Sequence, residues 1–281
     1  MEILDWVVLI FSIGFIVLYG IWKNIKNKDL QEYFKGSNKS RWWTIGISVM
    51  ATQASAITFL STPGQAYSDG MGFIQFYFGL PFAMIIISIF FLPIYHKLKV
   101  YTAYEFLEKR FNKKTRNLAS LLFLIQRGLA AGITIYAPAI IMSLILKWPL
   151  YLLIIIIGSL VTFYTLIGGT KAVNVTQKQQ MFVIFIGLFI AIYYIFKGIP
   201  KEFSLNEVLE IAGANGKLDI LNFDLDFKSR YTFWSGITGG LFLALSYFGT
   251  DQSQVQRYIS GKNLRESQKG LFFNAILKVA K

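Results

Sequence analysis

The stretch from Met50 to Gln65 concentrates small and hydroxyl-bearing residues inside an otherwise apolar region. It runs Met50-Ala51-Thr52-Gln53-Ala54-Ser55-Ala56-Ile57-Thr58 and ends in Ser61-Thr62-Pro63-Gly64-Gln65, which contains a helix-breaking Pro-Gly pair. An interrupted helix frees backbone carbonyls, and these together with hydroxyls are the oxygen ligands that a hard cation requires. The same residues also suit close helix packing, because small side chains let backbones approach and hydroxyls bond back to the preceding turn. Both interpretations stay open at this point.

Two cationic residues also lie inside apolar segments, where a charge is costly. An arginine such as Arg127 costs about 2.5 to 3.5 kcal/mol at the centre of a spanning helix, so we expect it to have a partner. That partner is a carbonyl, a carboxylate elsewhere in the chain, the interface reached by snorkelling, or an anionic substrate held by the guanidinium. Lys278, in Asn274-Ala275-Ile276-Leu277-Lys278, fits a lysine that faces a cavity or snorkels to the interface.

Enzymatic chemistry finds little support in the remaining residues. The chain has no cysteine and a single histidine, His96, beside Lys97 at the end of an apolar segment. It has no metal-ligand spacing, no Gly-x-Ser-x-Gly elbow and no phosphate-binding loop. We expect Asp251, which follows another apolar segment, to cap a helix or pair with Arg257. The sequence therefore predicts neither an enzyme nor a metal site built from histidine, cysteine or carboxylate ligands.

The elements that position these residues must be membrane-spanning helices. Of the 281 residues, 54% are hydrophobic and 17% aromatic, and the mean hydropathy is +0.50. A spanning helix needs about 20 mostly apolar residues, and lipid offers its backbone no other partner. Seven segments meet this requirement, at residues 3–22, 42–67, 73–95, 118–146, 150–168, 181–196 and 231–249, and an eighth begins near Gly270.

The net charge of +13 is a topology signal when the basic residues are placed on these segments. Most lysines and arginines follow the first, third, fifth and seventh segments, whereas acidic residues dilute the few in the alternate connections. Positive residues favour cytoplasmic loops, so we expect a multi-pass protein of the inner (plasma) membrane with its N-terminus outside. The lipid bilayer, and not nucleic acid, is the partner that this charge indicates.

Several stretches together resemble the sodium/solute symporter family, which includes sodium-coupled sugar, proline, sialic acid, vitamin and monocarboxylate transporters. They are, in order, residues 50–56 (MATQASA), 98–111 (LKVYTAYEFLEKRF), 135–139 (IYAPA), 164–173 (YTLIGGTKAV) and 249–258 (GTDQSQVQRY). Each is weak alone, but their order and spacing are specific, and they extend over nearly the whole chain.

The resemblance implies an all-α integral membrane fold, the inverted-repeat transporter fold with broken helices. It assigns residues 1–281 to the N-terminal part of a single transmembrane domain. The leading helix is 3–22, the first five-helix repeat about 42–196, an external loop 197–230, and the start of the second repeat 231–281. A complete protein would be about twice as long.

The resemblance also implies roles for individual residues. The backbone carbonyls of Ala51 and Ala54 would bind sodium, the co-transported ion. The substrate would be bound by residues that match substrate-facing, pocket-closing, sugar-contacting or carboxylate-binding positions: Ser55, Thr58, Phe76, Tyr77, Arg127, Tyr247 and Lys278. Where many members place an aspartate for a second sodium, this chain has Gln177, and a neutral amide offers one oxygen and no charge. We therefore expect one sodium per substrate.

These expectations combine into sodium-coupled symport of a small organic solute (a sugar, sialic acid, monocarboxylate or amino acid) by alternating access. Ion and solute would be coupled through the broken helix. The alternative is a sensor module of a solute-responsive signalling protein, because fold does not fix function. No obligate protein partner is evident in the sequence.

Overall fold

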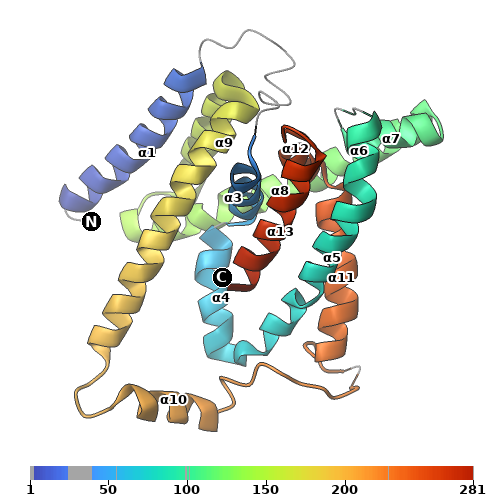
Figure 1. Cartoon of the computed structure of the whole chain (residues 1–281). Coiled ribbons are helices and arrows are strands. Elements are labelled where there is room, and N and C mark those ends of the chain that lie inside the picture. Colours follow the sequence, from blue (N-terminus) through green and yellow to red (C-terminus); the bar gives the residue numbers. More distant parts are fainter. Residues whose placement is uncertain are drawn as a thin grey trace.

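The computed structural model describes residues 3–24, 40–54, 56–98, 100, 102–226 and 228–280. Its elements are the following helices, shown in Figure 1: α1 (Ile3–Asn24), α3 (Trp42–Gln53), α4 (Ala56–Asp69), the 3₁₀ helix η1 (Met71–Tyr77), α5 (Gly79–Ile86), the π-helix η2 (Ile87–Phe91), α6 (Leu92–Leu98), α7 (Ala103–Arg110), α8 (Lys113–Leu146), α9 (Leu150–Gly198), α10 (Leu205–Ala214), α11 (Phe233–Thr250), α12 (Gln252–Ile259) and α13 (Leu264–Ala280). Among the described residues there is no strand, and Ser40 and Gly261 form an isolated bridge. The all-helical architecture is as predicted.

Three described helices are long and apolar enough to cross a membrane: Met71–Leu98, Lys113–Leu146 and Gln179–Gly198. Shorter apolar helices occupy Ile3–Phe15 and Leu150–Phe163. The predicted second span does not qualify because it is divided into α3 and α4, each shorter than a bilayer crossing.

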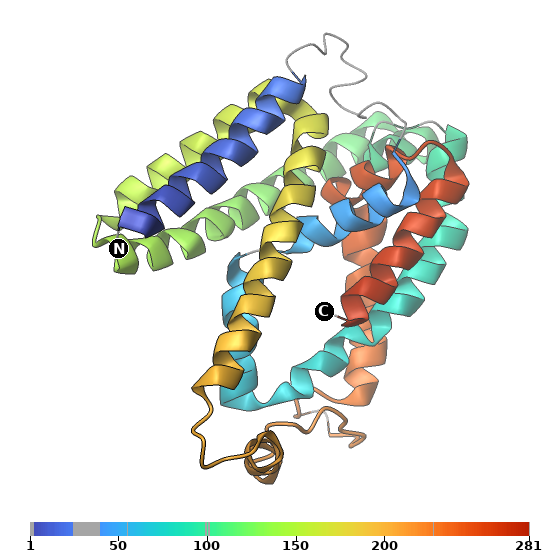
Figure 2. The same cartoon turned by 60° about the vertical axis from the view of Figure 1, so that its left-hand side comes forward.

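Helix α9 contains both the fifth and the sixth predicted spans. It is a single helix of 49 residues, but it bends sharply into two limbs (Figure 2). The first limb lies beside α1, and the second passes α3 and descends toward α10 (Figures 1 and 2). The chain thus reverses direction between the two spans, as the sequence predicts, without a separate loop.

Helices α3, α5, α11 and α13 enclose the main hydrophobic core. Its fully buried side chains include Ile45, Met84, Phe248 and Leu271, one from each of these helices. Glycines bring the backbones together: a Cβ on Gly240 would lie 2.3 Å from the carbonyl oxygen of Phe76. Small residues at helix contacts are the usual device for close packing in membranes. These helices therefore form one tightly packed body.

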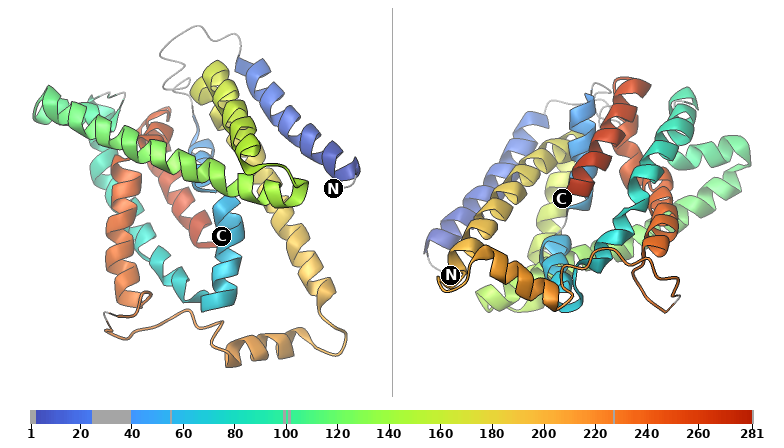
Figure 3. Two further views of the ribbon diagram at one scale, coloured as in Figure 1. Left: turned by 180° about the vertical axis from the view of Figure 1, so that it is seen from behind. Right: turned by 60° about the horizontal axis from the view of Figure 1, so that its bottom comes forward.

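The segment between α9 and α11 is tied to the corner where α4 meets η1. The amide of Met71 donates to the carbonyl of Lys217 at 2.9 Å, and Lys217 Nζ donates to the carbonyl of Ser68 at 2.7 Å. Gln75 Oε1 accepts from the amide of Asn222 at 2.9 Å. Figure 3 shows α10 lying across this end of the molecule. The described residues of the predicted external loop therefore form a strap, which includes the helix α10 and is hydrogen-bonded to α4 and η1.

Candidate functional site: the interrupted helix and its cavity

The predicted interruption of the second span is present and lies at Ala54. Helix α3 ends at Gln53, and Ala54 has extended backbone angles (φ −76°, ψ 102°) before α4 begins at Ala56. The amide of Ala54 donates to the carbonyls of Met50 and Ala51, both at 3.1 Å. A carbonyl oxygen has two lone pairs, so Ala51 keeps acceptor capacity beyond this bond. The break thus leaves backbone carbonyl oxygens at the C-terminal end of α3, and such carbonyls are the groups that coordinate a cation in interrupted helices.

A cavity of about 400 Å³ adjoins this break, between α4, η1 and the second limb of α9. Its wall is mostly apolar and aromatic, and it includes Phe59, Met71, Phe73, Ile74, Phe78, Ile184 and Leu188. The polar side chains on it are those of Gln53, Thr58, Thr62 and Tyr77, and none of the described residues that line it is charged. A concave apolar site with a few polar groups is the usual form of a small-molecule pocket.

Three of the predicted site residues line this cavity: Ala54, Thr58 and Tyr77. Thr58 Oγ1 lies 3.5 Å from the carbonyl oxygen of Gln53, so its hydroxyl spans the break. Ala51 is buried in the last turn of α3, where it packs with Met50 and Met181. The structure therefore brings the proposed ion ligands and part of the proposed substrate site together.

The remaining predicted substrate residues either do not line the cavity or lie outside the part of the chain that the structure describes. Phe76 is 38% exposed and is absent from the cavity wall, although its ring contacts that of Tyr77 edge-on at 6.1 Å between centroids. Ser55 and the side chain of Lys278 lie outside the described residues. Their proposed roles stay predictions.

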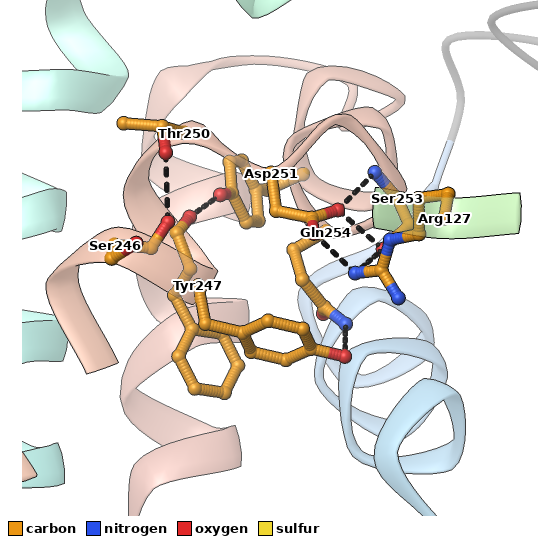
Figure 4. Close-up of polar contacts among 9 residues, drawn as sticks. Arg127, Ser246, Tyr247, Thr250, Asp251, Ser253 and Gln254 are labelled. Carbon is orange, nitrogen blue, oxygen red and sulfur yellow. Dashed lines mark hydrogen bonds and ion pairs between the residues drawn. The ribbon is translucent and has the colours of Figure 1, made fainter. Parts of the chain in front are cut away.

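Arg127 and Tyr247 belong to a second polar cluster, at the turn between α11 and α12 (Figure 4). Arg127 Nη2 forms an ion pair with Asp251 and also donates to Ser253 Oγ at 2.9 Å. The guanidinium carbon lies 5.4 Å from the centre of the Tyr247 ring, and Gln254 Nε2 donates to the Tyr247 hydroxyl at 2.8 Å. Of the partners considered for Arg127, the structure supplies a carboxylate of the chain itself. Asp251 caps α12 as expected, but its ion-pair partner is Arg127 and not Arg257.

Gln177 connects α9 to α3 within the last two turns of α3 before the break. Its side-chain oxygen accepts from Ser48 Oγ at 2.8 Å, and its amide nitrogen donates to Thr52 Oγ1 at 3.2 Å. Thr52 in turn donates to the carbonyl of Ser48 at 2.7 Å. The amide is therefore hydrogen-bonded to protein groups at both of its ends.

The sequence interpretation missed the apolar wall of the cavity and the ion pair. Met71, Phe73, Ile184 and Leu188 lie in apolar helices, where nothing in the sequence separates a cavity-facing side chain from a lipid-facing one. The Arg127–Asp251 pair joins positions 124 apart. The cost of placing Arg127 in an apolar helix predicted a partner but could not name it.

Comparisons with known proteins agree with this geometry. Residues 33–279 match the model of the sodium:solute symporter family. The chain is 33% identical over 267 residues to sodium-coupled monocarboxylate transporter 2 of Bos taurus, covering 95% of this chain and 43% of that protein. It is 29% identical to the human sodium/iodide cotransporter, covering 92% of this chain and 40% of the relative.

A solved structure has the same fold. It is a substrate-bound, outward-open state of a Na⁺-coupled sialic acid symporter, 27% identical with a TM-score of 0.90, covering 99% of this chain and 57% of that one. The chain thus spans less than half the length of the curated relatives it matches and over half of this structure. A family model that matches this much of the chain, together with an interrupted helix beside a cavity, shows that the protein belongs to the sodium:solute symporter family.

Proposed function

We propose that the complete protein carries out sodium-coupled symport of a small organic solute by alternating access. The observation that carries the proposal is the interruption at Ala54, which ends α3 on the wall of the cavity. Interrupted helices whose carbonyls coordinate the driving ion are the general device of such transporters. Relatives named as sodium-coupled monocarboxylate, sodium/iodide and sialic acid transporters support the same activity.

Sodium would bind at the carbonyls of Ala51 and Ala54, and the solute would occupy the adjoining cavity. Thr58 and Tyr77 line the cavity and would supply its hydroxyl groups, and Ser55 would join them. Because Thr58 also reaches the carbonyl of Gln53 across the break, an ion that fixes the break would orient Thr58 toward the solute. Each ligand would then favour the conformation that the other prefers, which is the requirement for coupling.

Among the solute classes considered, we favour a small monocarboxylate. The cavity wall offers an apolar body with a few hydroxyl and amide groups, which suits a short carboxylate with a hydrocarbon tail better than a sugar with many hydroxyls. Because none of the described residues that line the cavity is charged, the sodium ion bound beside it would balance the charge of the solute carboxylate. Relatives named as monocarboxylate transporters, at 33% identity, support this choice.

The protein would act in the plasma membrane with its N-terminus outside. The distribution of lysine and arginine supports this orientation, because the end of the molecule that carries α12 and the start of α8 is the basic one. The strap that contains α10 would then lie outside, and the turn between α11 and α12 would face the cytoplasm.

Uptake by the complete protein in proteoliposomes tests the proposal. Labelled short monocarboxylates, sugars and amino acids are supplied with an inward sodium gradient, and each measurement is repeated with the gradient replaced by potassium. We expect uptake of a monocarboxylate above equilibrium only with sodium. Accumulation that is unchanged in potassium would exclude sodium coupling, and accumulation of sugars alone would exclude the proposed solute class.

A further inference from the structure

The turn between α11 and α12 is contacted by Arg127 of α8, a helix that packs mainly on α7, α9 and α4. We propose that the ion pair between Arg127 and Asp251 is a latch that holds α8 against this turn and closes the solute pathway on that side of the break. Asp251 is then a positioning residue in the transport cycle. The role of this ion pair in transport rests on the proposed function, whereas the contact between Arg127 and Asp251 does not.

The carboxylate of Asp251 has two separate partners. Oδ1 accepts from the amide and the hydroxyl of Ser253, at 2.9 and 2.7 Å, and so caps α12. Oδ2 accepts from Arg127 Nη2 (Figure 4). The Asp251 side chain is only 6% exposed, against 30% for Arg127, and a carboxylate buried this far requires a countercharge. Arg127 supplies that charge from a different helix.

The rest of the turn is fixed by residues other than those of α8. The last carbonyls of α11 are satisfied by phenols: Tyr95 donates to Gly249 at 2.6 Å, and Tyr258 donates to Phe248. Gln252 Oε1 accepts from the amide of Ala103 at the start of α7. The shape of the turn therefore does not require Arg127, which leaves the ion pair free to open while the turn persists.

Helix α8 otherwise has little packing against this part of the molecule. It packs mainly on α7, α9 and α4, whereas α11 packs on η1 and α5, and α13 on α3. The guanidinium of Arg127 contacts the turn at Asp251, at Ser253 and at the Tyr247 ring. Where packed bodies meet at a sparse interface, an ion pair can join or release them without disturbing either core.

The latch and the cavity lie on different sides of the break. The cavity extends from Ala54 along α4 to Pro63 and Ala66, toward the end that carries α10, whereas Asp251 ends α11 at the opposite end of the molecule (Figure 1). In an outward-facing carrier the cavity opens to the outside, and the pathway from the cavity to the opposite side of the membrane must be closed. Opening the pair would remove the guanidinium from the face of the Tyr247 ring, while the Tyr247 hydroxyl keeps its hydrogen bond from Gln254.

Distance measurements on the complete protein test the latch. Spin labels are placed at Asn117→Cys on α8 and Lys262→Cys after α12, both exposed positions, in a cysteine-free background; residues 1–281 contain no cysteine. Distances are measured by double electron–electron resonance with and without sodium. The variants are Asp251→Asn, Arg127→Gln, the neutral double variant and the charge exchange Arg127→Asp with Asp251→Arg. Arg116→Gln is the matched control, because it breaks a similar arginine–carboxylate pair, between α8 and Glu108 of α7.

We expect both single variants and the neutral double variant to shift the ratio of long to short distances by roughly fivefold or more, the usual scale of coupling between states. The charge exchange should restore the original distribution, and Arg116→Gln should leave it unchanged. The neutral double variant contains no unpaired charge, so a shift there cannot come from misfolding around one.

An unchanged distribution in the neutral double variant would overturn the latch. So would a higher KM for the solute in Arg127→Gln without any change in distance, because Arg127 would then be a substrate ligand, as the resemblance implies. If the variants open the pair but sodium has no effect on any distribution or on uptake, the proposed function fails while the latch stands.

Discussion

Ser48 on α3 and Gln177 on α9 share a buried hydrogen bond of 2.8 Å, within the last two turns of α3 before the break at Ala54. The amide nitrogen of Gln177 donates to Thr52 Oγ1, and the family resemblance places at residue 177 an aspartate for a second sodium, which a neutral amide does not replace. We therefore predict one sodium per solute. The ratio of labelled sodium uptake to labelled solute uptake, measured in parallel in proteoliposomes, gives this stoichiometry, and a value of two would contradict it.

Thr58 tests the coupling between the ion and the solute. Replacing it with valine keeps the shape but removes the hydroxyl that lines the cavity and reaches Gln53. Loss of one hydrogen bond, about 1 kcal/mol, predicts that the apparent KM values for both solute and sodium rise by about fivefold. Thr238→Val is the control, because Thr238 is exposed on α11 and bonds only within its own helix. A Thr58→Val variant with both KM values unchanged would remove this helix from the mechanism.

The close approach of α11 to η1 predicts a stability difference between adjacent glycines. A Cβ on Gly240 would lie 2.3 Å from the Phe76 carbonyl oxygen, whereas a Cβ on Gly239 would meet nothing within 4 Å. Gly240→Ala should therefore destabilise the protein by about 1 to 3 kcal/mol, and Gly239→Ala should not, because alanine favours a helix. Thermal unfolding of the two variants in detergent measures the difference. Equal melting temperatures would show that the helices are not packed as described.

Much of the fold could be predicted from the sequence because a chain that crosses lipid can adopt only a few backbone structures, such as helices. Apolar length predicted the helices, and the family resemblance predicted the interruption near Ala54, which the structure places at Ala54 itself. The expectation that Pro63-Gly64 breaks the helix was wrong, because α4 continues through this pair to Asp69. The bend of α9 without a separate loop was not predictable, because the charged residues between the two spans are compatible with a helix as well as with a loop. Pairings such as Arg127 with Asp251, and Ser48 with Gln177, depend on the tertiary structure, for which a single sequence provides no direct signal.

The helix in the strap predicts a local dependence on pH. Glu207 accepts hydrogen bonds from the amide and hydroxyl of Ser204, at 2.6 and 2.9 Å, in a reciprocal cap that starts α10. These bonds hold the pKa of Glu207 below its usual 4.5. The cap therefore stabilises α10 fully above the unfolded pKa, and its contribution disappears as the pH falls through the lower folded value.

Hydrogen exchange of the α10 amides, corrected for intrinsic rates, measures this effect between about pH 6 and pH 3. Protection should fall with acid in the wild-type protein and should be lower but independent of pH in Glu207→Gln, which cannot ionise. A Glu207→Gln variant that keeps the same acid response would assign the effect to another group.

The most direct test of the account is a structure of the complete protein determined with sodium present. The account predicts density for a cation beside the carbonyl oxygens of Ala51 and Ala54, with the helix interrupted between Gln53 and Ala56 and density for the solute next to Thr58. A continuous helix across these residues, or an interruption with no cation in saturating sodium, would contradict it.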